Sequence, residues 1–325
     1  MQVHQLSSFT TRFWLGRAGL CAVGLWFGVS ASAQPLPTVG IATMFKNETP
    51  YMVEWIEYHR LLGVSAFWLY DNESTDSPEA VLAPYIEQGL VHLIRYPTVE
   101  KTLKFPLITQ VLSFRDGVTA ARGKVDWLAF IDMDEFFLPQ RDRSLPQCLA
   151  RFEPFGGVFV NWRCFGTSGV TLPQGGWLLG ALTACSLKGH PNNFTGKVLV
   201  RPDKVVVPAI NNVHWAPLLQ SELYAKGDGT SVSQEESSQS LMPVLQGDKL
   251  LVLNHYVMRD ENFFWNYRIP LYSGGAAICQ NHYRQYASVP NDAMIRFLKK
   301  NYPEAWNLHW APFVPNTPPL LFGAD

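Results

Sequence analysis

Two carboxylates separated by a single residue, Asp132 and Asp134, are the strongest chemical signal in the sequence. They follow the apolar residues 127–131 and precede the apolar residues 136–138, so the pair should lie at the rim of a core. Carboxylates placed in this way can bind a divalent cation from one side and leave its other positions to water and phosphate oxygens. The alternative is a pair of solvated acids in a tight turn. The apolar flanks favour contact with a metal or a nucleotide.

The residues around this pair predict strands that alternate with helices. The β-prone apolar runs span residues 39–44, 64–70, 91–95 and 127–131. Between them, Pro50 and Pro78 suit the first position of a helix, and Gly63 and Gly89 suit its left-handed stop. This βαβαβ order predicts a parallel sheet covered by helices.

Acidic turns follow two of these strands directly. Asp71 comes after the strand at 64–70, and Asp132 comes after the strand at 127–131. Because open α/β sheets bind ligands at the edge where the carboxyl ends of parallel strands meet, we expect both turns to face one crevice.

Composition and charge exclude several classes of protein. The 26 Lys and Arg residues nearly balance the 27 Asp and Glu residues, so no overall positive field attracts a nucleic acid. Apolar residues make up 47% and charged residues 16%, which predicts a globular chain and not a disordered one.

The first 33 residues have the composition of an export signal. Two arginines precede an uncharged run over residues 18–33 that ends in a small-x-small pattern, which predicts cleavage before Gln34. The alternative is an uncleaved anchor that associates with a membrane through residues 14–33. Its 16 uncharged residues fall short of the roughly 20 that span a bilayer.

Four cysteines follow this segment without a zinc-binding spacing, and they are compatible with disulfides or with free buried thiols: Cys148, Cys164, Cys185 and Cys279.

Five sequence blocks stand in a fixed order between residues 38 and 270. They are Lys46-Asn47-Glu48 to Asp71-Asn72-x-Ser74-x-Asp76, Phe130-Ile131-Asp132-Met133-Asp134-Glu135-Phe136, Asn161-Trp162-x-x-Phe165-Gly166, Lys197-Val198-Leu199-Val200-Arg201-Pro202 and Asn254-His255-Tyr256. Each block alone is weak evidence. Together, in this order, they resemble glycosyltransferase family 92 and the related family 2-like enzymes.

The resemblance implies an α/β fold of the GT-A type. This fold has a mostly parallel sheet covered by helices, with a Rossmann-like nucleotide half and a mixed acceptor-side lobe. On this basis residues 1–33 are a signal peptide or anchor, and residues 34–325 are a single catalytic domain. Its nucleotide-sugar-binding half spans residues 34–140, and its acceptor half, residues 141–325, contains a mobile insertion at about 227–240, which is rich in Ser, Gly and Gln.

The resemblance also implies an activity: transfer of a sugar from a UDP-sugar donor to a hydroxyl of a glycan or glycoconjugate acceptor, with inversion. Galactose is the sugar that the family suggests. The donor is supplied to the Golgi lumen of eukaryotes, so the leader predicts a lumenal or membrane-bound Golgi enzyme there. In a bacterium it predicts a membrane-anchored or periplasmic one.

By the same comparison, Mn²⁺ or Mg²⁺ would be held by Asp132, Asp134 and His255. Beside Tyr256, His255 is also compatible with a hydrogen-bonded core residue. The donor-binding residues would be Lys46, Asn47, Glu48, Asp71, Asn72, Ser74, Asp76, Arg122 and Asp132. Lys124 is the alternative to Arg122 for contact with the donor phosphates.

The candidate catalytic residues are Asp134, Glu135 and His214. Inversion requires a base that takes the acceptor proton, and the sequence does not distinguish Glu135 from Asp260 or Glu261 in this role. His214 is compatible with contact to a sugar ring or with packing beside Trp215.

Two other functions compete with this interpretation. The active-site motif of phosphatases of the haloacid dehalogenase type also begins with D-x-D after an apolar strand. In that motif Thr or Val stands two residues after the second Asp, where this chain has Phe136. A non-catalytic carbohydrate-binding protein on the same fold is the second alternative. The intact Asp132, Asp134 and His255 count against it.

Overall fold

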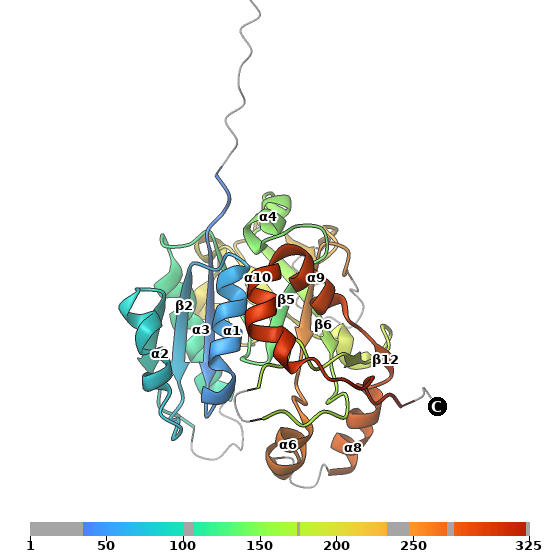
Figure 1. The fold of residues 1–325 in the computed structure, drawn as a ribbon. Coiled ribbons are helices and arrows are strands. Elements are labelled where there is room, and N and C mark those ends of the chain that lie inside the picture. Colours follow the sequence, from blue (N-terminus) through green and yellow to red (C-terminus); the bar gives the residue numbers. More distant parts are fainter. Residues whose placement is uncertain (1–34, 101–106, 174–175, 233–246, 272–275, 323–325) are drawn as a thin grey trace, which may run out of the picture. The chain divides into compact units, whose positions relative to one another are not determined.

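The computed structural model describes residues 35–100, 107–173, 176–232, 247–271 and 276–322 (Figure 1). The predicted leader and residues 233–240 of the predicted insertion lie outside the described residues. Leu36–Asp325 forms one compact unit. Among the helices of the described ranges, none has the length and apolar character needed to cross a membrane.

The amino-terminal half has the predicted order of strands and helices. Its elements are β1 (Val39–Phe45), α1 (Thr49–Leu61), β2 (Ala66–Asp71), α2 (Pro78–Glu87), β3 (Val91–Arg95), α3 (Leu107–Ala121) and β4 (Trp127–Phe130). Strand β1 pairs in parallel with β2 and with β4, and β2 pairs in parallel with β3. Pro50 is the second residue of α1 and Pro78 the first of α2, and after these helices Gly63 and Gly89 adopt φ angles of 99° and 71°. The parallel sheet and both helix stops are therefore confirmed.

Alternation along the strands divides the core between the two faces of this sheet. Phe67 and Leu69 of β2 pack in the same cluster as Trp55 of α1. Trp68 and Tyr70, which point to the other face, pack in a second cluster with α3. The helices thus cover both faces and leave the carboxyl edge of the strands to the connecting turns.

The second half extends the same sheet with mixed pairing. It contains β5 (Glu135–Pro139), β6 (Gly157–Cys164), β8 (Gly196–Val200), β9 (Tyr224–Lys226), β10 (Ser231–Val232) and β11 (Leu251–His255). Strand β8 joins β4 and β6 by antiparallel pairing, whereas β11 runs parallel to β6 and antiparallel to β5. The predicted α/β fold, parallel in its amino-terminal half and mixed in its second half, is therefore confirmed.

Short helices and one small strand pair complete this half. They are α4 (Leu145–Leu149), α6 (Glu261–Phe263), α7 (Ile269–Leu271), α8 (Ala276–Gln285), α9 (Ala293–Asn301), α10 (Pro303–Ala305), β7 (Ala184–Cys185) and β12 (Val289–Pro290). Helix α10 lies beside α1 on one face of the sheet (Figure 1).

A buried carboxyl group ties α1 to the end of the chain. Glu54 is 2% exposed and accepts hydrogen bonds from the backbone N–H groups of Leu178 and Leu179, at 2.6 and 2.9 Å. It also accepts one from the indole of Trp310 at 2.9 Å. Burial raises the pKa of Glu54 to about 7, although these three donors favour the charged form. One side chain therefore joins three distant segments.

The described cysteine side chains are free thiols. Cys148, Cys164 and Cys185 are all buried and unbridged, and burial raises the pKa of Cys148 to about 12. The side chain of Cys279 lies outside the described residues. Of the two interpretations left open by the sequence, buried thiols hold for these three residues.

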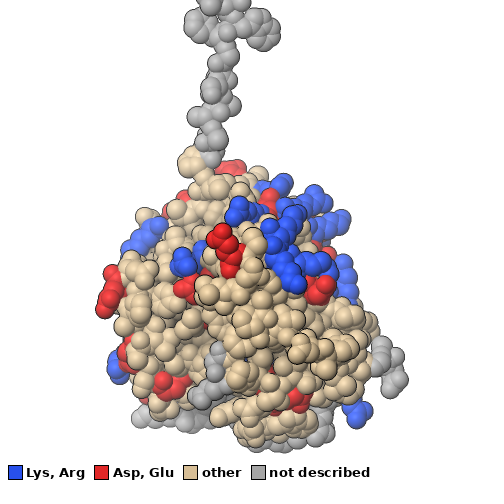
Figure 2. Space-filling model, viewed as in Figure 1, with Lys and Arg blue, Asp and Glu red and all other residues tan. Residues whose placement is uncertain are grey.

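The surface charge is unevenly distributed despite the balanced total. On the face of the molecule seen in Figure 2, Lys and Arg side chains gather at the end where Figure 1 places α4 and α9. Helix α9 contributes basic residues in its last turn, Lys299 and Lys300, both of them exposed.

The buried His59 predicts a loss of stability in acid. Burial lowers its pKa to about 3 from an ordinary value of 6.5, although a hydrogen bond to the Trp55 carbonyl, at 2.9 Å, opposes the shift. In the unfolded chain His59 therefore binds a proton below about pH 6.5, whereas in the folded chain it stays neutral down to about pH 3. The folded state is consequently destabilised relative to the unfolded state as the pH falls from 6.5 to 3. Between pH 7 and pH 5 we expect the free energy of unfolding to fall by about 2 kcal/mol from this group.

Urea unfolding of wild type and His59→Gln at both pH values measures this effect. The variant should lose that part of the pH dependence, while His92→Gln, at an exposed position, should keep the wild-type dependence. Equal pH dependence in wild type and His59→Gln would contradict the prediction.

Candidate active site

The predicted acidic turns line one pocket of about 680 Å³ at the carboxyl edge of the strands. The turns after β1, β2 and β4 and the end of β11 all contribute to its wall. The sequence-predicted residues that line it are Lys46, Asn47, Glu48, Asn72, Asp132, Asp134, His214 and His255. The expectation that separate turns meet in one crevice is therefore confirmed.

Asp132 lies at the rim of this pocket and pairs with a buried cation. Its side chain is 35% exposed, and its Oδ2 lies 3.0 Å from Nζ of Lys197, whose side chain is only 1% exposed. Burial alone would lower the pKa of Lys197, but the carboxylates of Asp132 and Glu135 outweigh this and raise it. A permanently charged lysine thus fixes the first carboxylate of the pair.

Asp134 is buried beside His255. Its Oδ1 lies 3.5 Å from Nε2 of His255 and has no hydrogen-bond partner. Burial would raise the pKa of Asp134, but its interactions with His255, Arg259 and Arg268 outweigh burial and hold it well below its ordinary range. The carboxylate is therefore ionised at neutral pH.

Glu135 does not line the pocket, contrary to its predicted catalytic role. Its side chain is fully buried, and its Oε2 accepts a hydrogen bond from the backbone N–H of Asp132 at 2.8 Å. The indole of Trp55 donates to the carbonyls of both residues at 3.1 Å. Burial raises the pKa of Glu135 well above its ordinary value despite the nearby Lys197. We therefore correct this assignment: Glu135 braces the turn that presents Asp132.

Arg259 supplies a second buried cation to the same pocket. Nη2 of its guanidinium lies 2.5 Å from Oε2 of Glu48, and Cζ lies over the rings of Tyr51 and Phe263, 3.9 and 4.4 Å from their centroids. Nε and Nη1 of Arg259 have no hydrogen-bond partner. Its backbone adopts a φ angle of 50°, which is strained for a residue with a side chain. Burial raises the pKa of Glu48 to about 7, although Arg259 opposes the shift.

His214 reaches the pocket as a neutral imidazole. Burial and the charge of Lys197 lower its pKa to about 4. Its Nδ1 lies 2.9 Å from the carbonyl oxygen of Gly196, and because a carbonyl can only accept, Nδ1 carries the proton. The other ring nitrogen is therefore a proton acceptor.

The turn at residues 71–76 braces the donor side of the pocket and touches it only through Asn72. Asp71 accepts the N–H of Ser74, and Ser74 accepts the N–H of Asn47, at 2.9 and 3.0 Å. Asp76 accepts the N–H of Thr49, the first residue of α1, at 2.9 Å. Asp71, Ser74 and Asp76 do not line the pocket, so their predicted contact with a donor is corrected to a supporting role.

Arg122 and Lys124 lie away from the pocket. Arg122 donates to the carbonyls of Pro202 and Val205, at 3.1 and 2.8 Å, and Lys124 lies over the ring of Trp68 at 5.9 Å. Both residues precede β4 and therefore lie at its amino end, opposite the edge where Asp132 follows it. The prediction that either contacts the donor phosphates is wrong.

The other acids considered as a base are engaged in structural hydrogen bonds. Asp260 accepts the N–H groups of Leu172 and Phe263 at 2.9 and 3.1 Å. Glu261 accepts from the hydroxyl of Tyr283 at 2.6 Å and from the hydroxyl of Thr167. Neither lines the pocket.

The acidic pair and His255 fit part of a divalent metal site. Within the described ranges, no three His, Cys, Asp or Glu side chains converge into a complete ligand set. Oδ1 of Asp134, which has no hydrogen-bond partner, nevertheless lies 3.5 Å from Nε2 of His255, close to the spacing of two ligands on one ion with bonds of about 2.0–2.2 Å. These two groups fit a site that Asp132, water and phosphate oxygens would complete.

Sequence reasoning missed several pocket-lining residues and assigned no role to Lys197. The pocket-lining residues with polar, charged or aromatic side chains that were not predicted include Gln110, Arg259, Phe263, Tyr267 and Arg268. Trp162, a residue type that more often packs in a core than contacts a sugar, also lines it.

Comparisons with known proteins agree with this architecture. The sequence profile described as glycosyltransferase family 92 matches residues 37–224. A glycosyltransferase family 92 protein of Oryza sativa subsp. japonica is 30% identical over 190 residues, which are 57% of this chain and 30% of that protein. One from Ricinus communis is 28% identical over 194 residues, 58% and 33% of the two chains. This chain thus spans about a third of the length of these curated relatives.

Among solved structures, S. aureus TarS 1–349 is 11% identical, covers 83% of this chain and 74% of its own, and has a TM-score of 0.37. Glucosyl-3-phosphoglycerate synthase from Mycobacterium tuberculosis, solved with Mn²⁺ and UDP, is 18% identical, covers 39% and 44%, and has a TM-score of 0.28. The family profile covers more than half of the chain. The chain therefore belongs to glycosyltransferase family 92.

Proposed function

We propose that this chain is a metal-dependent inverting glycosyltransferase that moves a sugar from a UDP donor to a hydroxyl of a glycan, with galactose as the donor sugar. The observation that carries the proposal is the ionised, buried Asp134 beside His255 in a pocket of about 680 Å³ that Asp132 also lines. Family membership supports the reaction class.

The donor would lie across the turns at the carboxyl edge. Lys46, Asn47, Glu48 and Asn72 line the part of the pocket nearest β1 and β2, where they would bind the nucleoside. Arg259 would donate its unpartnered N–H groups to the diphosphate, because a buried guanidinium binds phosphate oxygens strongly.

Asp132, Asp134 and His255 would hold Mn²⁺ or Mg²⁺. When bound, the cation supplies positive charge that stabilises the departing diphosphate. The acceptor oxygen forms its bond to the anomeric carbon as the bond from that carbon to the diphosphate breaks, and the electron pair leaves with UDP. His214 would take the hydroxyl proton on its free ring nitrogen, because its other nitrogen donates to Gly196.

Release of UDP by the purified chain tests this proposal. We expect turnover of UDP-galactose with Mn²⁺ or Mg²⁺, much less of its C4 epimer UDP-glucose, and none after treatment with EDTA. NMR of the product should show a β-linked sugar from the α-linked donor. Turnover that persists in EDTA would refute the metal requirement, and turnover of another donor in place of UDP-galactose would refute only the choice of sugar. If no UDP-sugar is turned over, the proposed function is wrong.

A further inference from the structure

A second cavity, of about 220 Å³, shares a wall with the candidate active site. Trp162, His255 and Arg268 line both spaces. The second cavity lies past the ends of β6 and β11, which are parallel, with Cys164 opposite His255. It therefore opens at the same edge of the sheet as the larger pocket.

The shared wall carries buried polar atoms without partners. The His255 side chain is 10% exposed; its Nε2 faces Asp134, and its Nδ1 has no hydrogen-bond partner. The Nε1 atom of Trp162, whose ring centroid lies 4.3 Å from that of His255, also has none. Because a buried polar atom without a partner is costly, these atoms point to a ligand that can hydrogen-bond to both.

The opposite wall combines aromatic rings with an amide. The ring of Tyr286 stacks on that of His282, with centroids 5.2 Å apart and planes 4° apart, and the side-chain amide of Asn192 donates to the Tyr286 hydroxyl. Val257 and Met258 add apolar surface, and none of the described residues that line this cavity is acidic. Flat rings beside a few polar groups suit a sugar, which has apolar C–H faces and polar hydroxyl edges.

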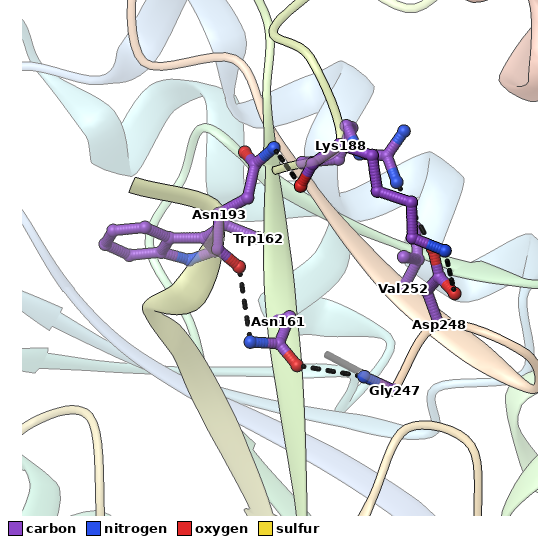
Figure 3. Close-up of a pocket in the computed structure, with 8 residues that line it drawn as sticks. Asn161, Trp162, Lys188, Asn193, Gly247, Asp248 and Val252 are labelled. Atoms are coloured by element: carbon purple, nitrogen blue, oxygen red, sulfur yellow. Dashed lines mark hydrogen bonds and ion pairs between the residues drawn. The ribbon is translucent and has the colours of Figure 1, made fainter. Parts of the chain in front are cut away.

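The segment that carries Asn192 is fixed to β6. Asn161 donates to the Asn193 carbonyl at 3.2 Å and accepts from the N–H of Gly247 at 3.4 Å, and Lys188 pairs with Asp248 at 3.0 Å (Figure 3). The cavity between these residues measures about 10 Å³, room for roughly one water molecule. These contacts have a structural role: they hold Asn192 in place beside the cavity of about 220 Å³.

We propose that the cavity of about 220 Å³ binds the terminal sugar ring of the acceptor, with its hydroxyl groups on the Trp162–His255 wall and one ring face on the aromatic wall. This inference rests on the proposed function. One hydroxyl of the ring would reach past the shared wall to the anomeric carbon of the donor. The new carbon–oxygen bond forms there as UDP leaves with its electron pair and the hydroxyl proton passes to His214.

The test uses residues that line this cavity but not the donor pocket. We would measure UDP release by His282→Ala and Asn192→Ala without acceptor, where water takes the sugar, and with methyl glycosides of galactose, glucose, N-acetylglucosamine and fucose as acceptor probes. His309→Ala is the matched control, because His309 also stacks on an aromatic ring, that of Trp177 at 4.6 Å, and does not line either cavity.

Both cavity variants should raise the KM for the preferred glycoside about tenfold or more, since each removes one stacking or hydrogen-bonding contact. Hydrolysis by the variants, and both activities of His309→Ala, should stay within about twofold of wild type. An unchanged acceptor KM in both cavity variants would overturn the inference.

Saturation-transfer NMR of the same glycosides with UDP present separates this inference from the proposed function. If UDP release is absent from wild type but a glycoside binds wild type and not His282→Ala, the subsite stands and the proposed function falls. If no glycoside binds wild type, the subsite is wrong.

Discussion

Replacing Asp134 by Asn is expected to lower kcat/KM for UDP release at least about 100-fold, the loss typical of removing one group that stabilises developing charge. The change removes the buried negative charge next to His255 and keeps the size of the side chain. A neutral amide is a weaker ligand for a divalent cation than a carboxylate, so the variant should also bind Mn²⁺ poorly. Steady-state rates with UDP-galactose over a series of Mn²⁺ concentrations measure both effects.

Two comparisons make this result specific. Asp203→Asn, at an exposed position, should keep wild-type rates. Asp132→Asn should lose less than Asp134→Asn, because Asp132 is 35% exposed and already neutralised by Lys197. Near-normal turnover by Asp134→Asn, with an unchanged Mn²⁺ dependence, would show that this carboxylate does not take part in the reaction.

Lys197→Met is expected to lower the free energy of unfolding by about 3–5 kcal/mol, the largest loss of stability among the variants that we consider. Lys197 is fully enclosed, and its ammonium group balances the carboxylates of Asp132 and the buried Glu135. Its removal leaves Glu135 without a nearby positive charge in the core. Urea unfolding monitored by tryptophan fluorescence measures the change.

Lys204→Met is the matched control. Its Nζ pairs with Glu222 at 2.8 Å, but its side chain is 42% exposed, so the loss should be no more than about 1 kcal/mol. A double variant, Lys197→Met with Glu135→Gln, should recover part of the loss because both buried charges are gone. If the free energy of unfolding of Lys197→Met lies within about 1 kcal/mol of the wild-type value, the buried Lys197 does not stabilise the fold through Asp132 and Glu135 as we infer.

The fold of the amino-terminal half was predictable because its signals are local. Pro50, in the first turn of α1, and Gly63, just after its end, mark the helix in sequence as in space, and β2 is a short apolar run that ends in an acid. Strand β5 was missed because the apolar residues 136–138 were interpreted only as a flank of the acidic pair, although Glu135–Pro139 is buried at every position. Its partner β11 begins more than 100 residues later, and no local pattern indicates that pairing.

The site was predictable where position along a strand decides it. Asp132 follows β4 and Asn72 follows β2, so the parallel arrangement alone brings them to one edge, whereas His255 was predicted only from the family resemblance. Arg122 was chosen for its charge, and its position at the opposite end of β4 excludes that role. Asp71 shows a different limit: an acid that braces a turn and an acid that binds a ligand have the same sequence pattern, and only the hydrogen bond to Ser74 distinguishes them.

Buried cations are the part of the site that sequence reasoning could not reach. Lys197 lies in an apolar strand and Arg259 in an irregular turn, and lysine and arginine are usually exposed. Their burial depends on carboxylates contributed by other segments, namely Asp132 for Lys197 and Glu48 for Arg259. Only the assembled fold reveals these pairs.

The contact between Glu54 and Trp310 has a consequence for synthesis of the chain. The two residues are 256 positions apart, so α1 leaves the ribosome long before its indole partner exists. Until then the Glu54 carboxyl group lacks one of its three donors, and the face of the sheet beneath α9 and α10 is uncovered. Because long loops close slowly, the nascent chain must keep this apolar face from aggregating until Trp310 has been synthesised.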